Sequence, residues 1–328
     1  MALFPVSSSI VSATALAPFL AEQYGLRSEA TCKLLKAGIS HTYLLTNGPT
    51  RFIFRLYTLN WRSRTEILEE VRLLYLLQEK DIPVSYAIPD QTGEYIQEIT
   101  AAEGLRYGVM FSYATGEKLF TFTTEVHAHI GEVMARMHQL THKLHLNRET
   151  YTPERLLVDS FVYLQQRLPA DTDEMRFMQR AQTYLLHELQ HADTAQLRQG
   201  IVHLDIWFDN LHIDRDHRVT LFDFDFCGNG WLCLDVAYYI LQIHSTEKVE
   251  QERDQKVASF LAGYESVTPL TGEEKRLLPM LGVTLYFFYL GIQCQRYENW
   301  SNVFLTETHL KRYVNFLVKK YFDDHGLG

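Results

Sequence analysis

Cysteine is scarce in this chain, which has only four among its 328 residues: Cys32, Cys227, Cys233 and Cys294. They are scattered, and no two of them form a C-x-x-C pair. This spacing excludes a dense disulfide framework and the common C-x-x-C redox and zinc motifs. We therefore expect four reduced thiols, in or near the core of a cytoplasmic protein.

An excess of positive charge is also missing. The chain has 31 Lys and Arg against 40 Asp and Glu, which gives a formal net charge of −9. No basic domain or Lys/Arg run stands out, which argues against a nucleic-acid-binding protein. The acidic balance agrees with a cationic partner, although an excess of acid is usually only a solvated surface.

Outside the N-terminus we find no run of about 18 apolar residues, so we expect no transmembrane helix and no membrane partner. Residues 2–21 are uncharged, but no basic region precedes them, and Pro5, Pro18 and the polar run 7–9 interrupt their apolar residues. These features favour an ordinary helix from Ser12 to Tyr24 over a signal peptide. Internal repeats and low-complexity segments are missing as well.

The most informative stretch of the chain runs from Ile201 to Tyr238. His203, Asp205 and Asn210 form an H-x-D-x-x-x-x-N array there. A second acidic cluster follows at Asp223 and Asp225, and another carboxylate lies at Asp235, just before a predicted helix.

A short hairpin is predicted between the array and the first of these carboxylates. Residues 211–213 and 219–222 have strand character, and the polar residues 214–217 between them are typical of a turn. The hairpin would fold Asp223 back beside Asn210. A carboxylate and an amide oxygen brought together in this way suit a hard divalent cation such as Mg²⁺, which can share the phosphate oxygens of a nucleotide.

Each of these acids also has a plainer interpretation. Asp214 and Asp216 fit simple turn chemistry, Asp223 could be an acid at a strand end, and Asp235 could cap a helix that starts at Val236. The joint order of loop, hairpin, acid and second acid before a helix is more specific than any single residue. Asp205 would then lie where a phosphoryl-transfer enzyme orients the attacking hydroxyl.

This stretch resembles the catalytic segment of the aminoglycoside phosphotransferase and choline kinase family, which includes homoserine-kinase-like and stress-response-kinase-like members. The family motif H-G-D-x-x-x-x-N corresponds to residues 203–210, and its D-L-A corresponds to residues 235–237. The resemblance implies an ATP- and Mg²⁺-dependent kinase.

The resemblance also implies a role for each matching residue. Asp205 and His203 would be the catalytic residues, with Asp205 as the base. Asn210 and Asp223 would be metal ligands, and Asp235 would brace the loop. One departure is that Leu204 stands where the family mostly has glycine. If that position requires a positive φ, a branched side chain would be strained there.

In the N-terminal part, residues 43–45 and 52–57 have strand character and are joined by a turn at 47–49. Arg55 is a charge inside the second of these apolar runs. It could be an edge-strand arginine that reaches water, or it could correspond to the phosphate-binding lysine of kinases, which pairs with a helix glutamate.

Helical phase selects that glutamate within the helix predicted from Arg62 to Lys80. Measured from Ile67 at 100° per residue, Glu70 falls at about 300°, on the apolar face, and Glu69 at about 200°, on the opposite face. A buried glutamate requires a cationic partner. We therefore predict that Glu70 pairs with Arg55.

Two further nucleotide contacts come from the resemblance. The loop at 38–41 would lie over the phosphates, with backbone amides and the hydroxyl of Ser40 in contact with them. Residues 112–117 would be a hinge, and backbone groups from Phe111 to Tyr113 would bind the adenine edge. A strand that simply leads to a turn at Gly116 is an equally good interpretation.

We predict an α+β, protein-kinase-like bilobal fold. A small N-terminal lobe (1–111) would hold an antiparallel sheet and one helix, and a larger, mainly helical lobe (118–328) would hold the catalytic loop and the acceptor-binding helices. The helices expected in the larger lobe are 125–142, 153–166, 175–198, 251–264, 273–297 and 307–321. An aromatic stretch begins in the helix expected at 273–297 and runs on to residue 300. Its rings could surround an ammonium group by cation–π attraction, although most of them should be core: Tyr286, Phe287, Phe288, Tyr289, Tyr297 and Trp300.

The expected function is phosphorylation of a small hydroxyl-bearing molecule, such as an amino alcohol, homoserine, a sugar or an aminoglycoside. Two alternatives stay open. A protein kinase of the stress-response type is possible, but only eleven residues separate Asp223 from Asp235, which is too few for a long peptide-docking segment. A nucleotide-binding scaffold without activity is the other, because the phosphate loop has little glycine and Leu204 departs from the motif.

Overall fold

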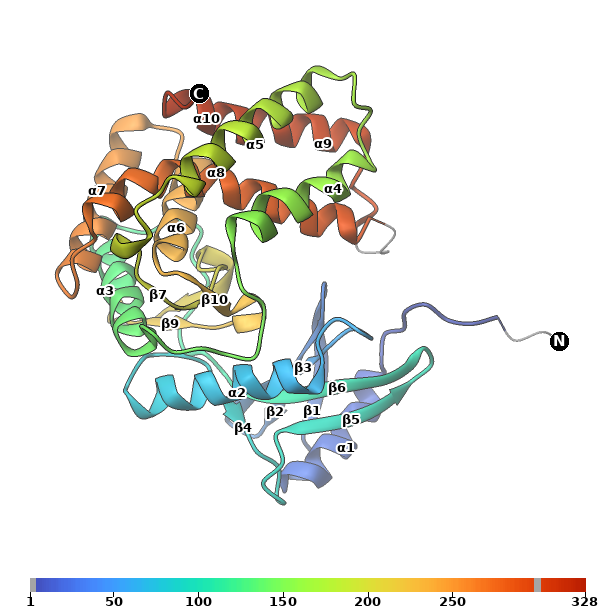
Figure 1. The fold of residues 1–328 in the computed structure, drawn as a ribbon. Coiled ribbons are helices and arrows are strands. Elements are labelled where there is room, and N and C mark those ends of the chain that lie inside the picture. The colour runs from blue at the N-terminus through green and yellow to red at the C-terminus, as the bar shows by residue number, and fades with distance from the viewer. Residues whose placement is uncertain (1–3, 298–301) are drawn as a thin grey trace. The chain divides into compact units, whose positions relative to one another are not determined.

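The computed structural model describes residues 4–297 and 302–328 (Figure 1). The chain divides into two compact units. Unit 1 contains the described residues up to Glu117 together with His212–Asp214 and Thr220–Asp223. Unit 2 contains Lys118–Leu211, Arg215–Val219 and the described residues from Phe224 onward. The long first segment of unit 1 thus ends where the predicted hinge segment ends, while its function as a hinge stays a prediction.

Unit 1 is built on a six-stranded sheet with the order β1-β2-β3-β6-β4, in which β5 also pairs with β6. Among the described residues, every strand pairing in this sheet is antiparallel. The elements are α1 (Ala13–Tyr24), β1 (Thr31–Ala37), β2 (His41–Asn47), β3 (Thr50–Leu56), α2 (Arg64–Glu79), β4 (Ala87–Ile88), β5 (Ile96–Ala101) and β6 (Gly104–Ser112). The turn predicted at 47–49 is confirmed, since Asn47 pairs with Thr50 across it.

Local sequence signals explain both helices of unit 1. Helix α2 begins with a capping box, in which the hydroxyl of Ser63 accepts from the backbone N–H of Glu66 and the carboxylate of Glu66 accepts in return from the N–H of Ser63. Helix α1 ends at Gly25, whose φ of 60° is a left-handed cap that favours glycine. The core of the unit joins α1 to the sheet: Leu16, Leu20, Tyr43, Leu45, Phe54, Leu56 and Met110.

Unit 2 is mainly helical. Its helices are α3 (Thr124–Thr141), α4 (Ser160–Gln165), α5 (Asp173–Gln190), α6 (Cys233–Thr246), α7 (Glu250–Glu265), α8 (Gly272–Gln295), α9 (Glu307–Tyr313) and α10 (Lys320–Asp324), with π-helical turns at Glu154–Asp159 and Val314–Lys319. The predicted helix 175–198 is too long, because α5 ends at Gln190 and a 3₁₀ turn and a strand follow it.

Two small sheets frame the catalytic stretch. Strand β7 (Gln199–Val202) pairs antiparallel with β10 (Gly228–Trp231), which the sequence analysis did not predict. The predicted hairpin is confirmed as β8 (Leu211–Ile213) and β9 (Val219–Leu221). Within unit 1, Ile213 forms a bridge with Glu117 and Leu221 forms one with Val84. These bridges connect the hairpin to unit 1.

Helix α8 is long and apolar enough to cross a membrane, and it is the one such helix among the described residues. Its most apolar window is 78% buried inside the protein, however. Burial of this extent is expected of the central helix of a packed domain.

Candidate active site

The predicted catalytic loop, called the catalytic loop below, leaves β7 at His203 and is held by Asp235, in the first turn of α6. The buried carboxylate of Asp235 accepts hydrogen bonds from the backbone N–H of His203, at 2.8 Å, and of Leu204, at 2.6 Å. It also lies 3.0 Å from Nε2 of His138. A carboxylate only accepts, so His138 carries a proton on Nε2. Asp235 therefore braces the loop, and the alternative of a helix cap is wrong.

Asp205 is fixed at both oxygens of its carboxylate. The hydroxyl of Tyr238 donates to Oδ1 at 2.7 Å, and Nδ2 of Asn210 donates to Oδ2 at 2.7 Å. The backbone N–H of Asp205 donates to Nδ1 of His203 at 3.1 Å. The ring of His203 is buried and packs on Phe224, with 4.2 Å between ring centroids. In this structure His203 thus shapes the loop from its buried side.

Leu204 has a φ of +62° and a fully buried side chain. The left-handed backbone that the sequence analysis associated with glycine is therefore present, with leucine in its place. This conformation costs roughly 1–2 kcal/mol for an L-residue with a Cβ atom. Both backbone groups of Leu204 are hydrogen bonded, the N–H to Asp235 and the carbonyl to the hydroxyl of Tyr289. These bonds hold the residue in place.

In unit 1 the pairing of Arg55 with Glu70 is confirmed. Nη1 of Arg55, on β3, lies 3.2 Å from Oε1 of Glu70, on α2, and both side chains are buried. The hydroxyl of Tyr57 donates to the second oxygen of Glu70 at 3.1 Å. Nη2 of Arg55 lies 2.7 Å from Oδ1 of Asp223. Arg55 thus connects the helix glutamate to the carboxylate that follows the hairpin.

Of the predicted metal ligands, Asn210 belongs to unit 2 and Asp223 to unit 1. The amide nitrogen of Asn210 is turned toward Asp205, which leaves the amide oxygen to face another partner. Asp223 has a side chain 40% exposed, so its carboxylate can accept a further partner besides Arg55. An amide oxygen and a carboxylate are hard oxygen donors and fit Mg²⁺. In the described part of the chain no three His, Cys, Asp or Glu side chains form a metal-binding cluster.

The predicted phosphate loop lies between β1 and β2. Its backbone turns tightly, since the N–H of Gly38 donates to the carbonyl of Ser40 at 3.2 Å. Among the described residues, the buried Oγ of Ser40 and Nδ1 of His41 have no hydrogen-bond partner. Buried polar atoms rarely stay unpaired. An unpaired hydroxyl on this loop is what a phosphate contact would require.

The predicted adenine contacts lie at the end of β6. Phe111 pairs with strands on both sides, and the backbone and hydroxyl groups of Ser112 bond to Ser85 and Tyr86. These bonds occupy the edge of the strand. The backbone of Tyr113 is therefore the better candidate for an adenine contact, and its ring is covered by the guanidinium of Arg51 at 3.9 Å.

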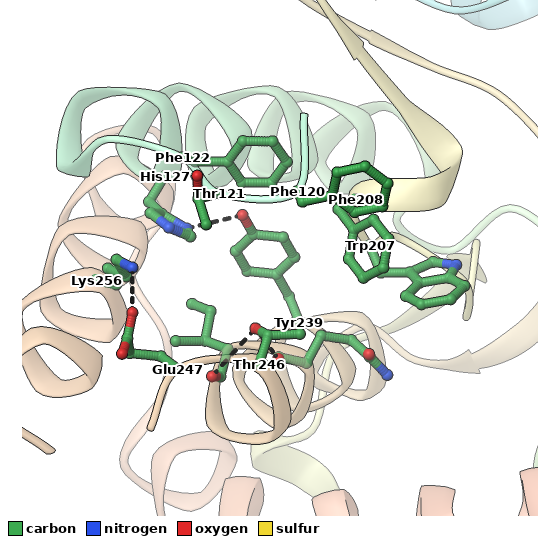
Figure 2. Close-up of a pocket in the computed structure, with 12 residues that line it drawn as sticks. Phe120, Thr121, Phe122, His127, Trp207, Phe208, Tyr239, Thr246, Glu247 and Lys256 are labelled. Atoms are coloured by element: carbon green, nitrogen blue, oxygen red, sulfur yellow. Dashed lines mark hydrogen bonds and ion pairs between the residues drawn. The ribbon is translucent and has the colours of Figure 1, made fainter. Parts of the chain in front are cut away.

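A small aromatic cavity of about 50 Å³ lies in unit 2, and the loop residues Trp207 and Phe208 form part of its wall. Figure 2 shows the side chains that line it. Its walls come from the segment after Lys118, from the loop and from α6, and they include Phe120, Phe122, Trp207, Phe208 and Tyr239. Its polar groups bond to one another: His127 to the hydroxyl of Tyr239 at 2.9 Å, and Lys256 to Glu247 at 2.5 Å. The cavity therefore offers a ligand mainly aromatic surface.

The aromatic residues of α8 are mostly core, as expected. Tyr286, Phe287 and Phe288 are buried, whereas the hydroxyl of Tyr289 reaches the catalytic loop. The guanidinium of Arg167 lies 4.2 Å above the ring of Tyr297. Trp300 lies outside the described residues.

Sequence reasoning missed three side chains that support the catalytic loop, namely His138, Tyr238 and Tyr289. A signal existed for Tyr238, because it follows Asp235 by three residues and so shares a helix face with it. His138 lies 97 residues from Asp235, and Tyr289 lies 85 residues from Leu204, so local spacing could not identify them.

Comparison with known proteins identifies the family and the fold. The model of the phosphotransferase enzyme family matches residues 31–270. A homoserine kinase of Methylobacillus glycogenes is 27% identical over 78% of this chain and 77% of its own length.

Two solved structures share the fold. The microcompartment-associated aminopropanol kinase has a TM-score of 0.78 at 21% identity and covers 96% of this chain and 99% of its own. An amicoumacin kinase in complex with AMP-PNP and Ca²⁺ has a TM-score of 0.74 at 18% identity, with 95% and 93% covered. The predicted α+β, kinase-like fold is confirmed. Since the family model spans most of the sequence, the chain belongs to the phosphotransferase enzyme family and is a kinase with an alcohol group as acceptor.

Proposed function

We propose that this protein transfers the terminal phosphate of ATP, in the presence of Mg²⁺, to a hydroxyl of a small molecule. The observation that carries the proposal is the fixed carboxylate of Asp205. Tyr238 and Asn210 hold its two oxygens, on a loop whose backbone is held by Asp235. A carboxylate held in this way can accept a hydrogen bond from an alcohol and orient it.

Asp205 acts mainly by positioning. A carboxylate with the ordinary aspartate pKa of about 4 is a weak base toward an alcohol. In a loose phosphoryl-transfer transition state the proton moves late, so orientation of the hydroxyl contributes more than proton removal. His203 takes part by accepting the backbone N–H of Asp205, which fixes the loop.

The nucleotide would be bound by residues that keep their predicted roles. Arg55 binds phosphate oxygens in a forked manner, Ser40 offers its hydroxyl, and within the predicted segment 111–113 the backbone of Tyr113 contacts adenine. Asn210 and Asp223 supply oxygen ligands to Mg²⁺. The bound metal supplies charge neutralisation at the bridging and terminal phosphate oxygens.

Among possible acceptors we favour an alcohol that carries an amine. The support is the net charge of −9 and the activities named for two relatives, a homoserine kinase and an aminopropanol kinase. Sugars and aminoglycosides are the other candidates. All four cysteines are free thiols, which agrees with the proposed cytoplasmic location.

The test is ADP release from Mg·ATP over a panel of choline, homoserine, 1-amino-2-propanol, sugars, aminoglycosides and serine-containing peptides, with mass spectrometry of the products. We expect a phosphate ester of one small molecule, and only with the metal present. Phosphorylated peptides alone would support the protein-kinase alternative. Thermal stabilisation by ATP that ignores Mg²⁺, without any ADP release, would support the inactive scaffold instead.

A further inference from the structure

Leu204, in the catalytic loop, has a backbone conformation that is unusual for leucine. With a φ of +62° this residue adopts a backbone conformation that L-residues other than asparagine and aspartate rarely adopt. Its side chain is completely buried. Leu204 directly precedes Asp205. Any relaxation of its backbone would therefore turn the Asp205 carboxylate.

Tyr289, on α8, acts on the carbonyl of that residue. Its hydroxyl donates a hydrogen bond to the carbonyl oxygen of Leu204, while Asp235 accepts from the N–H of the same residue. Two elements of unit 2 thus hold the left-handed peptide from its two ends. Glycine would adopt this conformation without such support.

Tyr238, on α6, acts on the next residue. Its hydroxyl donates to Oδ1 of Asp205 at 2.7 Å, and its ring packs on the ring of Tyr289 with 5.1 Å between centroids and 32° between planes. Burial, together with the negative charge of Asp205, raises the pKa of both phenols well above its usual value. Both hydroxyls therefore keep their protons and remain donors.

We propose that Tyr238 and Tyr289 form a clamp on the catalytic loop and are positioning residues for Asp205. Tyr289 holds Leu204 in the left-handed conformation, and Tyr238 orients the carboxylate. The clamp takes over the task that a glycine performs by its own conformational freedom. This inference rests on the proposed phosphotransfer, in which Asp205 orients the acceptor hydroxyl.

The experiment combines Tyr289→Phe with Leu204→Gly, singly and together. With Mg·ATP and the best acceptor of the panel, Y289F should lower kcat about tenfold. This factor corresponds to about 1.4 kcal/mol, which is about the free energy of one hydrogen bond. The dissociation constant of Mg·AMP-PNP should change less than about twofold, because the nucleotide contacts lie elsewhere. In the L204G background the same Y289F change should lower kcat by less than about threefold, because glycine needs no support.

A purely structural role for the Tyr289 hydroxyl would give the same loss in both backgrounds, and that result would overturn the clamp. An unchanged kcat in Y289F would overturn it as well. Tyr238→Phe should also lower kcat while Mg·AMP-PNP affinity is kept, and a parallel loss of both would count against its role. Wild-type protein without Mg²⁺-dependent ADP release would remove the proposed function itself, so the two failures are distinguishable.

Discussion

The guanidinium of Arg55 lies between two carboxylates of unit 1, with Glu70 at 3.2 Å and Asp223 at 2.7 Å. Glu70 is 1% exposed and also accepts from Tyr57. Buried acids of this kind are stable only when their oxygens are paired with donors. The contacts that stabilise the fold therefore also orient the guanidinium of Arg55. Glu70 thus stabilises the protein and, in the proposed function, positions the phosphate-binding arginine.

Removal of Glu70 should be costly. Glu70→Ala leaves a buried guanidinium and a buried phenol with one partner fewer, and we expect the free energy of unfolding to fall by about 3 kcal/mol. Urea denaturation measures this directly. The matched control is Glu69→Ala, because Glu69 pairs with Arg72 at the surface and should contribute less than about 1 kcal/mol. Equal losses in the two variants would contradict the buried ion pair.

A second residue predicts how stability depends on pH. His127 is 5% exposed, and burial, with a smaller contribution from the positive charge of Lys256, lowers its pKa to about 4. The unfolded chain, with a histidine pKa of about 6.5, binds the proton more readily between these two values. This contribution to stability is therefore complete above pH 6.5 and is lost as the pH falls toward 4.

We expect wild-type protein to lose about 2–3 kcal/mol of unfolding free energy through His127 between pH 7 and pH 4.5. His127→Gln should remove this part of the loss. His129→Gln, at an exposed position of the same helix, should leave the pH dependence unchanged. Urea denaturation at the two pH values decides, and identical slopes in all three proteins would contradict the assignment.

At the scale of elements, helices α3 and α7 cross at two glycines. A Cβ atom on Gly131 would lie 2.1 Å from the carbonyl oxygen of Phe260, and one on Gly263 would lie 1.9 Å from that of Ala128. Backbone atoms cannot move away as a flexible side chain can. The close approach of these two helices therefore depends on glycine. It also positions His138, on α3, against Asp235.

Gly263→Ala should separate the two helices and lower the free energy of unfolding by about 2–3 kcal/mol, as overpacking does. Gly272→Ala is the control, since a Cβ atom there meets nothing within 4 Å, and it should stay within about 0.5 kcal/mol of wild type. Thermal or urea unfolding measures both. A neutral Gly263→Ala would show that the helices do not need this close contact.

Elements with a local signal were predictable from sequence. The β8–β9 hairpin has a polar turn between two apolar triplets, and α2 has its capping box. Strands β7 and β10 carry no such signal, because each has four residues and Gly228 and Gly230 interrupt the second. Helix α5 was predicted too long because no glycine or proline lies between Gln190 and Arg198. Its end is instead marked by a tertiary contact, the N–H of Asp193 to Glu273 at 3.1 Å.

The same distinction applies to the candidate site. Helical phase alone was enough to select Glu70 as the partner of Arg55, and motif spacing placed Asp205 and Asn210 on one loop. The clamp tyrosines lie 33 and 85 residues from the atoms they hold. Their positions follow from how α6 and α8 pack, which residue patterns do not encode locally.

At the scale of the whole molecule, the residues with proposed roles are divided between the two units. Asp205 and Asn210 belong to unit 2, whereas Arg55, Glu70 and Asp223 belong to unit 1. We therefore predict that mutations can separate nucleotide binding from phosphate transfer. Residues of unit 1 should affect Mg·ATP affinity, and Asp205 should affect turnover.

The most direct measurement compares Asp205→Asn with wild-type protein, with Asp216→Asn in the exposed hairpin turn as the matched control. ADP release and Mg·ATP affinity are measured for all three. If Asp205 orients the acceptor hydroxyl, Asp205→Asn should lower turnover by about 10²–10⁴-fold. The dissociation constant of Mg·ATP should stay within about twofold of the wild-type value, and Asp216→Asn should behave as wild type. Loss of Mg·ATP binding with retained turnover in Asp205→Asn would contradict this role.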